Sequence, residues 1–169
     1  QSLMRLQIQE RLLKHLPFAA GVGIDIDENA LACCFVNVEK HKLLHRARLI
    51  ISDITTDDFF LFLHQNMQCD IIVCNPPYLP KNIDICNNIE LKYEPQKALY
   101  ADDGGLFFYK KILPKIKMNL LPKGIAVFEI SPNQAKKKKH IAHTYFHENE
   151  CSFIFDENGH IRGKKKKKS

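Results

Sequence analysis

Short apolar runs alternate with longer amphipathic segments along most of the chain. Apolar runs of four to eight residues bounded by turn residues are typical of buried strands, and apolar positions three and four apart are typical of helices. The sequence predicts strands over 19–26, 47–51, 70–74, 124–130 and 151–155. It predicts helices over 3–16, 28–42, 57–64, 104–121 and 134–149.

This alternation predicts the fold class. Strands that alternate with helices form a mostly parallel, doubly wound α/β sheet with right-handed crossovers. The run 70–74 contains three consecutive β-branched residues, as expected of a strand that is covered on both faces. Asn158-Gly159 is a hairpin signal, so the chain should end in an antiparallel pair. The segment 79–102 has little periodicity and is predicted to be a long loop.

Three polar residues stand where predicted strands end. They are Asp25, Asp53 and Asn75. Ligands of such sheets bind in the crevice at the carboxyl ends of the strands, so these residues are the candidates for a binding site. Asp25 can hold a ribose diol or cap the next helix together with Asp27, and we favour the ribose. Asp53 can be a loop acid or lie near a base, and we favour the base.

Asn75-Pro76-Pro77-Tyr78 carries the candidate chemistry. Two prolines stiffen the corner after the strand, and neither has an N–H group to donate. The Asn75 side-chain oxygen and the Pro76 carbonyl can then accept both hydrogens of a planar –NH₂ group, which Tyr78 can cover by stacking. We therefore predict a site that positions an amide or amino nitrogen for methylation, although such a tetrapeptide can also be a plain turn.

Composition limits the other functions. The chain has 169 residues, 45% of them hydrophobic, which suits one globular domain. Of the net charge of +6, Lys164 to Lys168 supply five, so we predict a folded domain over 1–163 and a disordered basic tail over 164–169. The remaining charge is too small to favour direct nucleic-acid binding. Six cysteines without a Cys-x-x-Cys pair indicate reduced thiols, and no membrane span or leader is visible, so we expect a cytoplasmic protein. We also expect it to be a monomer.

Two further clusters, one of histidines and one of lysines, are interpreted as residues without a binding function. His140, His143 and His147 have helical spacing, but no fourth ligand is placed to complete a metal site, so we predict none. Lys136 to Lys139 can bind RNA or an acidic partner, yet solvated lysines are the expectation.

The residues resemble the HemK/PrmC glutamine methyltransferases, which methylate the Gly-Gly-Gln glutamine of peptide chain release factors. The similarity runs from about Gly21 to Gly163. It is carried by Gly23-Ile24-Asp25-Ile26-Asp27, Ser52-Asp53-Ile54, the tetrapeptide at Asn75, Glu94-Pro95-Gln96-Lys97-Ala98-Leu99, Asp103-Gly104-Gly105-Leu106, Phe108-Tyr109, Phe128-Glu129-Ile130 and Gln134.

The resemblance implies a class I, Rossmann-like fold and S-adenosylmethionine as the cofactor. It implies that Asp25 and Ile26 contact the ribose, that Asp53 and Ile54 flank the adenine, and that Asn75 lies near the methyl donor as well as the acceptor. Asn75, Pro76, Pro77 and Tyr78 would hold the glutamine of a release factor. Glu94 is a candidate acid or shapes the substrate loop, and we assign it to substrate binding.

The family's first strand with its Gly-rich loop and its N-terminal helical domain have no counterpart in this sequence. Gly21-Val22-Gly23 leads into Asp25 and does not open a helix, so it belongs to the second strand. Two alternatives stay open: an adenine amino methyltransferase that acts on DNA or RNA, and a truncated, inactive binding module.

Overall fold

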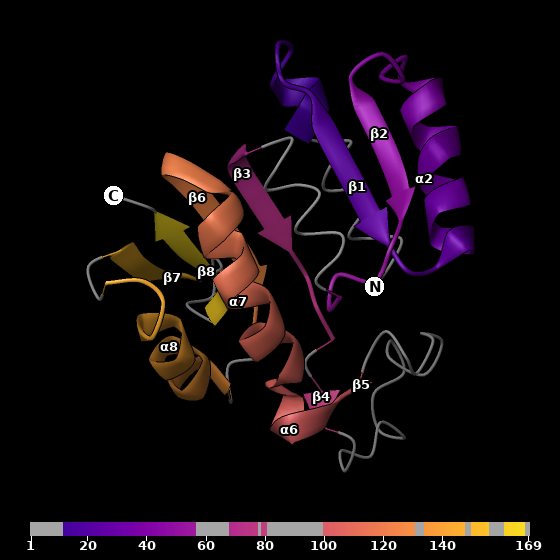
Figure 1. Ribbon diagram of the computed structural model, residues 1–169. Helices are drawn as coiled ribbons and strands as arrows, with labels where there is room; N and C mark the ends of the chain where they lie inside the picture. Colours follow the sequence, from indigo (N-terminus) through magenta and orange to yellow (C-terminus); the bar gives the residue numbers. More distant parts are fainter. Residues whose placement is uncertain are drawn as a thin grey trace. The chain divides into compact units, whose positions relative to one another are not determined.

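The computed structural model describes residues 12–56, 68–77, 79–80, 100–130, 134–147, 150–155 and 161–167 (Figure 1). The chain divides into two compact units, an N-terminal unit over Gln1–Phe59 and a C-terminal unit over Phe60–Ser169. The predicted helix over 57–64 lies outside the described residues, as does most of the predicted loop 79–102.

The N-terminal unit is a β–α–β element. After a helical turn at 12–15 come β1 (Gly21–Asp25), α2 (Glu28–Lys40) and β2 (Ala47–Ile51). β1 and β2 pair in parallel, from Gly21 opposite Ala47 to Asp25 opposite Ile51. Parallel neighbours need a crossover, and α2 provides it. The predicted strands and helix are confirmed, although α2 ends two residues earlier than expected.

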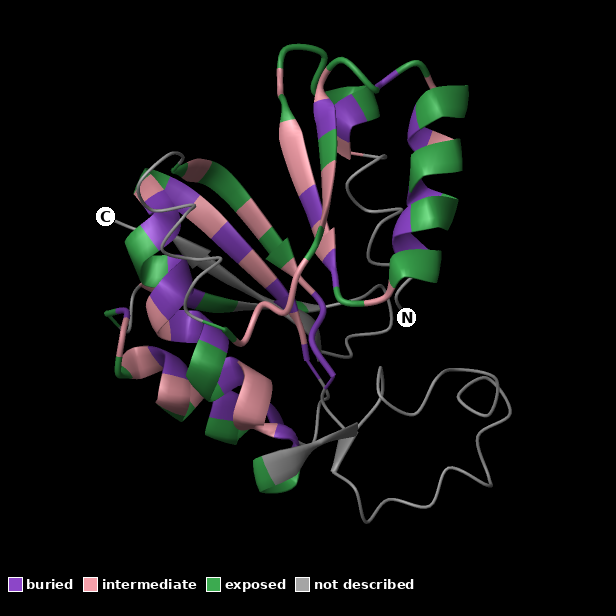
Figure 2. Cartoon of the chain, turned by 45° about the vertical axis from the view of Figure 1, so that its right-hand side comes forward, coloured by how far each residue is buried: buried purple, intermediate pink, exposed green. Residues whose placement is uncertain are grey.

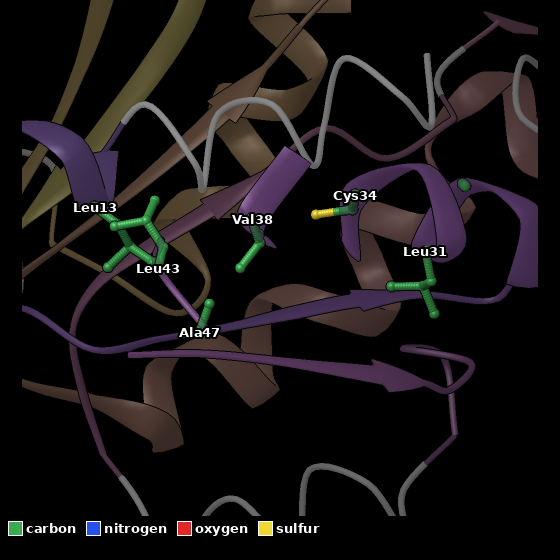
Figure 3. Packing of buried hydrophobic residues seen from close by; sticks show 7 residues of the cluster. Leu13, Leu31, Cys34, Val38, Leu43 and Ala47 are labelled. Atoms are coloured by element: carbon green, nitrogen blue, oxygen red, sulfur yellow. The ribbon is translucent and has the colours of Figure 1, made fainter. Parts of the chain in front are cut away.

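The core of this unit follows the apolar stripe of α2 (Figure 3). The buried residues of α2 are Ala30, Leu31, Cys34 and Val38, which share one face of the helix. In Figure 2 the buried positions of α2 lie on the side of the helix that faces the strands, and the exposed positions lie on its outer side. His41 is the C-cap of α2, and its N–H donates to the Asn37 carbonyl.

Arg46 ties the segment before β1 to the segment before β2. Its guanidinium donates hydrogen bonds to the carbonyls of Leu13, Leu16 and Ala19, at 3.1, 2.9 and 2.7 Å. These carbonyls lie at the end of a helical turn, where no intrahelical donors remain. The five donors of the planar guanidinium suit this role better than an ammonium group would.

The C-terminal unit contains a mixed sheet in the order β3-β6-β8-β7. β3 (Cys69–Cys74) and β6 (Leu120–Glu129) are parallel, whereas β8 (Ile161–Lys167) runs antiparallel to β6 and to β7 (Cys151–Phe155). β4 (Leu79–Pro80) and β5 (Tyr100–Ala101) form a separate parallel pair. The predicted parallel sheet with a C-terminal antiparallel hairpin is confirmed.

The described part of this unit contains three helices: α6 (Asp102–Gly105), α7 (Phe107–Asn119) and α8 (Ala135–His143). The single helix predicted over 104–121 is wrong at its start, because Asp103, Gly104 and Gly105 have positive φ angles of 56°, 61° and 84°. Left-handed residues cannot continue a right-handed helix. α7 buries Tyr109, Ile112, Leu113 and Ile116 at helical spacing.

β6 begins four residues before the strand predicted over 124–130. Its register with β3 jumps from Cys69–Leu120 to Ile71–Ile125, so the residues between form a bulge. Lys123 has φ 64° in this bulge, and a Cβ on Gly124 would meet the Leu121 carbonyl oxygen at 2.8 Å. Gly124 is therefore needed for a close backbone approach, and regular pairing starts after it.

The lysine run at the end of the chain is not the predicted disordered tail. Lys164 to Lys167 belong to β8, which pairs with β6 on one side and with β7 on the other. Backbone pairing on both edges satisfies the N–H and C=O groups of these residues, and this requirement does not depend on side-chain charge.

Both faces of β3 were expected to be covered, and this prediction is wrong for the described residues. Ile71 and Val73 are 45% and 38% exposed. β3 is an edge strand that pairs only with β6 in the described part of the chain. No described strand pairs with the outer edge of β1 either, so none occupies the place of the family's first strand. No helix in the described ranges is long and apolar enough to cross a membrane.

Candidate functional site

In the C-terminal unit, Asn75-Pro76-Pro77 directly follows β3, where Cys74 lies opposite Phe128 of β6. All three residues are buried, and the Asn75 side chain is 5% exposed. Neither Nδ2 nor Oδ1 of Asn75 has a hydrogen-bond partner among the described residues. An unsatisfied buried polar group costs about 1–3 kcal/mol, so natural structures keep one where it has a use.

The prolines fix the corner that presents this amide. Pro76 is among the fully buried side chains of the described structure, and both prolines lack an N–H group. The corner can therefore accept hydrogen bonds through its carbonyls but cannot donate them from Pro76 or Pro77. A donor such as a planar –NH₂ group fits this arrangement. Tyr78 and Glu94, the other predicted acceptor-site residues, lie outside the described residues.

In the N-terminal unit, Asp25 and Asp53 lie at neighbouring strand ends, as predicted. Asp25 closes β1, and its carbonyl accepts a hydrogen bond from the Ser52 N–H at 3.0 Å, just after β2. The Asp25 carboxylate is 7% exposed, and Oδ1 accepts from the Asp27 N–H at 3.0 Å. Asp27, not Asp25, caps α2, since its side chain accepts from the Asn29 N–H at 3.0 Å.

This division of roles separates the two interpretations of Asp25. Because Asp27 caps the helix, Asp25 is not needed there, and its second oxygen, Oδ2, has no partner in the described structure. A largely buried carboxylate with one oxygen held in place is suited to accept hydrogen bonds from a ribose diol. Ile26 is 68% exposed beside it and offers an apolar surface. These residues fit the nucleoside of S-adenosylmethionine that the resemblance implies.

Asp53 is oriented by its own turn. Its Oδ1 accepts from the backbone N–H of Thr55 at 2.8 Å and from the Thr55 hydroxyl at 2.7 Å. One carboxylate oxygen is thus committed to the turn, and the other remains for a donor such as an exocyclic amino group. Ile54, in the same turn, is partly exposed. The turn therefore brings an acceptor and an apolar side chain to the end of β2.

A buried lysine was missed by the sequence analysis, which expected Lys136 to Lys139 to be solvated. Lys138 is 1% exposed, and its Nζ lies 4.0 Å from the centroid of the Tyr109 ring. The Tyr109 hydroxyl donates to the Glu129 carbonyl. Burial lowers the pKa of Lys138 to about 7, against the opposing charge of Glu129. The sequence signal for this burial is the helical spacing of Lys138 with Ala135 and Ala142, which are both buried.

Lys138 should make stability depend on pH. Its folded pKa is lower than its ordinary value of 10.5, so above about pH 7 the unfolded chain binds a proton that the folded chain has lost. The free energy of unfolding should therefore rise with pH between about 7 and 10, by at most roughly 1.4 kcal/mol per pH unit. Below pH 7 both states are protonated and this contribution is constant.

Urea unfolding of the chain at several pH values measures this rise. The pH values run from about 6 to 9.5, a range set by the lysine titration. Lys138→Met should flatten it, whereas Lys137→Met, at an exposed position on the same helix, should leave it unchanged. Equal slopes in the two variants would contradict the assignment.

The three histidines considered as metal ligands do not all lie on one helix. α8 ends at His143, so His147 lies beyond it, and the helix predicted over 134–149 is too long. In the ranges that the structure describes, no three His, Cys, Asp or Glu residues are grouped so that they could hold a metal ion.

Comparison with known proteins identifies relatives of this chain by sequence. No protein-family model matches the chain. Ribosomal protein uL3 glutamine methyltransferase of Francisella tularensis is 37% identical over 112 residues, which make up 66% of this chain and 33% of that protein. Release factor glutamine methyltransferase of Flavobacterium psychrophilum is 33% identical over 141 residues, 79% of this chain and 45% of that protein. The chain is related by sequence to the HemK/PrmC glutamine methyltransferases.

The chain spans between a third and a half of the length of these HemK/PrmC relatives. Among solved structures, TrmN from Thermus thermophilus matches 96% of this chain and 40% of its own chain, with a TM-score of 0.60 and 16% identity. That likeness concerns the fold alone. It confirms the Rossmann-like α/β fold predicted for this chain.

Proposed function

We propose that this chain is the catalytic part of an enzyme that transfers a methyl group from S-adenosylmethionine to a glutamine side-chain amide. The acceptor is the Gly-Gly-Gln glutamine of a peptide chain release factor. The buried Asn75 amide, with both polar atoms unsatisfied in the described structure, carries the proposal. The names of the relatives support the choice of glutamine. We further propose that the protein is a monomer in the cytoplasm and does not bind nucleic acid directly.

Each unit contributes its own groups to the proposed reaction. In the N-terminal unit, Asp25 and Ile26 would hold the ribose, and Asp53 and Ile54 the adenine, of S-adenosylmethionine, which supplies an electrophilic methyl group when bound. In the C-terminal unit, Asn75 and the Pro76 carbonyl accept both hydrogens of the glutamine –NH₂ group.

These hydrogen bonds matter because an amide nitrogen is a poor nucleophile. Its lone pair is delocalised into the carbonyl group, and positive charge develops on nitrogen as the new bond forms. Acceptors placed on the N–H groups strengthen their hydrogen bonds as that charge develops, which lowers the barrier. The rigid Asn75-Pro76-Pro77 corner fixes the nitrogen in one orientation, and positioning of this kind contributes up to roughly 7–11 kcal/mol in well-oriented reactions. The released proton goes to solvent.

Tyr78 would cover the planar amide and Glu94 would shape the substrate loop.

A second acceptor has specific support. The 37% identical relative acts, by its name, on ribosomal protein uL3, so a uL3 glutamine is the alternative protein substrate. Adenine amino methylation and an inactive binding module remain the alternatives of a different kind.

Transfer of a labelled methyl group tests the proposal. The chain is incubated with methyl-labelled S-adenosylmethionine and, separately, with a release factor, the same factor carrying Gln→Asn in its Gly-Gly-Gln motif, uL3, and an adenine-containing DNA duplex. We expect label only in the unaltered release factor. Label in uL3 or in DNA would replace the proposed acceptor. Absence of label in every acceptor, at saturating cofactor, would contradict the proposed activity of this chain.

A further inference from the structure

A hollow of about 510 Å³ lies on the C-terminal unit where the beginnings of α7 and α8 meet. The Gln134 side chain, at the N-cap of α8, donates to the Gly104 carbonyl at 2.8 Å and holds these two helix starts together. The hollow is lined by Leu106, Lys110, Lys136, Lys137, His140 and Ile141. None of these residues belongs to the proposed catalytic site.

The lining is divided into an apolar floor and a basic rim. Leu106 and Ile141, the two aliphatic residues, are half-buried, whereas the three lysines and His140 are exposed. Among the lining residues, none is acidic. The described structure gives Lys110 an acidic partner, Asp103, at 2.6 Å, but it gives none to Lys136 or Lys137.

The position of the rim lysines on α8 makes their charge unfavourable for the helix itself. α8 has no acidic residue in its first turn, and its N-cap makes no side-chain capping bond. Positive side chains near a helix N-terminus are opposed by the helix dipole. Local helix stability therefore does not explain Lys136 and Lys137, whereas an anionic partner would.

We propose that this hollow docks an acidic segment of the protein substrate, with an aliphatic or aromatic side chain seated on Leu106 and Ile141. The proposal rests on the proposed function, because it assigns the hollow to the same protein acceptor. Carboxylates flanking the seated side chain complement Lys136 and Lys137. A peptide suits the hollow better than RNA, because its floor is aliphatic and its lining offers a single stacking ring, the exposed His140 imidazole, whereas single-stranded nucleic acid binds largely by stacking successive bases on aromatic rings.

Fluorescence anisotropy with labelled decapeptides tests the docking directly on the full chain. The first probe carries four glutamates around one leucine, the second has Leu→Ser, and the third is a single-stranded RNA decamer. We expect the leucine probe to bind and the serine probe to bind about tenfold more weakly, as expected for partial burial of one leucine. Tighter binding of RNA than of the leucine probe, lost on Lys136→Glu/Lys137→Glu, would overturn the proposal in favour of nucleic acid.

Charge reversal separates docking from folding. Lys136→Glu/Lys137→Glu should weaken the leucine probe by about tenfold or more, since two favourable pairs become repulsive. Its melting temperature should not fall, because acids near a helix N-terminus are stabilising. The control pair Lys111→Glu/Lys123→Glu changes two exposed lysines outside the hollow and should leave probe binding unchanged. Equal affinity of the rim variant and the unaltered chain would overturn the proposal.

Methylation kinetics distinguish this inference from the function on which it rests. With the whole protein substrate, the rim variant should raise KM about tenfold and leave kcat unchanged, whereas with a short Gly-Gly-Gln peptide neither value should change. An unchanged KM for the whole protein overturns the docking assignment alone. No methyl transfer by the unaltered chain overturns the proposed function, and specific binding of the leucine probe would then still support the docking surface.

Discussion

Replacing Asn75 with alanine should lower the rate of methyl transfer to glutamine by about 10²–10³-fold at saturating cofactor. The Asn75 amide is buried at 5% exposure and has no partner in the described structure, so its hydrogen-bonding capacity is available to a ligand. Its removal takes away one of the two acceptors that hold the substrate –NH₂ group. Single-turnover transfer to a release factor measures the rate of the chemical step.

The same substitution should not lower the free energy of unfolding, because it removes a buried polar group that is unsatisfied in the free chain. A purely structural role for Asn75 would not give a lower rate of methyl transfer together with an undiminished free energy of unfolding. Asn75→Asp keeps one acceptor oxygen and should lose less activity than Asn75→Ala.

Asn119→Ala is the matched control. Asn119 is also a buried asparagine of the C-terminal unit, at 1% exposure, but its Nδ2 donates to the Lys115 carbonyl at 2.9 Å. Its replacement should cost stability, about 0.5–1.5 kcal/mol for a lost hydrogen bond, and spare the rate. Loss of stability without loss of rate in Asn75→Ala would show that Asn75 is structural.

Asp25→Ala should weaken binding of S-adenosylmethionine by about 10- to 100-fold, since hydrogen bonds to a charged group contribute roughly 1.5–3 kcal/mol. Asp25 ends β1 with one oxygen held by the Asp27 N–H, so the carboxylate is already oriented for a diol. Calorimetric titration gives the Kd. Asp25→Asn keeps the bond to Asp27 but loses the charge, and its Kd should lie between those of the unaltered chain and the alanine variant.

Asp27→Asn provides the comparison for this experiment. Asp27 caps α2, and asparagine caps a helix about as well as aspartate does, so cofactor affinity and stability should both be retained. If Asp25→Ala bound the cofactor as tightly as Asp27→Asn, the ribose assignment would be wrong.

The parts of the fold that are local in sequence could be predicted. α2 has an aspartate N-cap and a regular apolar stripe, and these two signals define its start and its buried face. β2 was predicted residue for residue because its apolar residues, interrupted only by Arg48, are bounded by the polar Arg46 and Ser52. The neighbouring positions of Asp25 and Asp53 follow from parallel pairing of the two strands that they end.

The features that depend on tertiary contacts could not be predicted in this way. Lys138 stands in a run of four lysines, and only its packing against Tyr109 distinguishes it from its solvated neighbours. The left-handed Gly104 and Gly105 delay the start of α7 to Phe107 in a segment that was predicted to be helical from residue 104. The missing partners of Asn75 are likewise a property of its surroundings, so the sequence could identify the residue but not its unsatisfied state.

The middle position of β8 changes how the end of the chain should be treated. Charge suggests that residues 164–169 can be removed without harm. Their deletion would take away more than half of the strand that separates β6 from β7, leaving two rows of backbone donors and acceptors without partners. An affinity tag fused at Ser169 would join the polypeptide only two residues after an interior strand, so a spacer is advisable. The short form ending at Gly163 should be prone to association through the exposed strand edges.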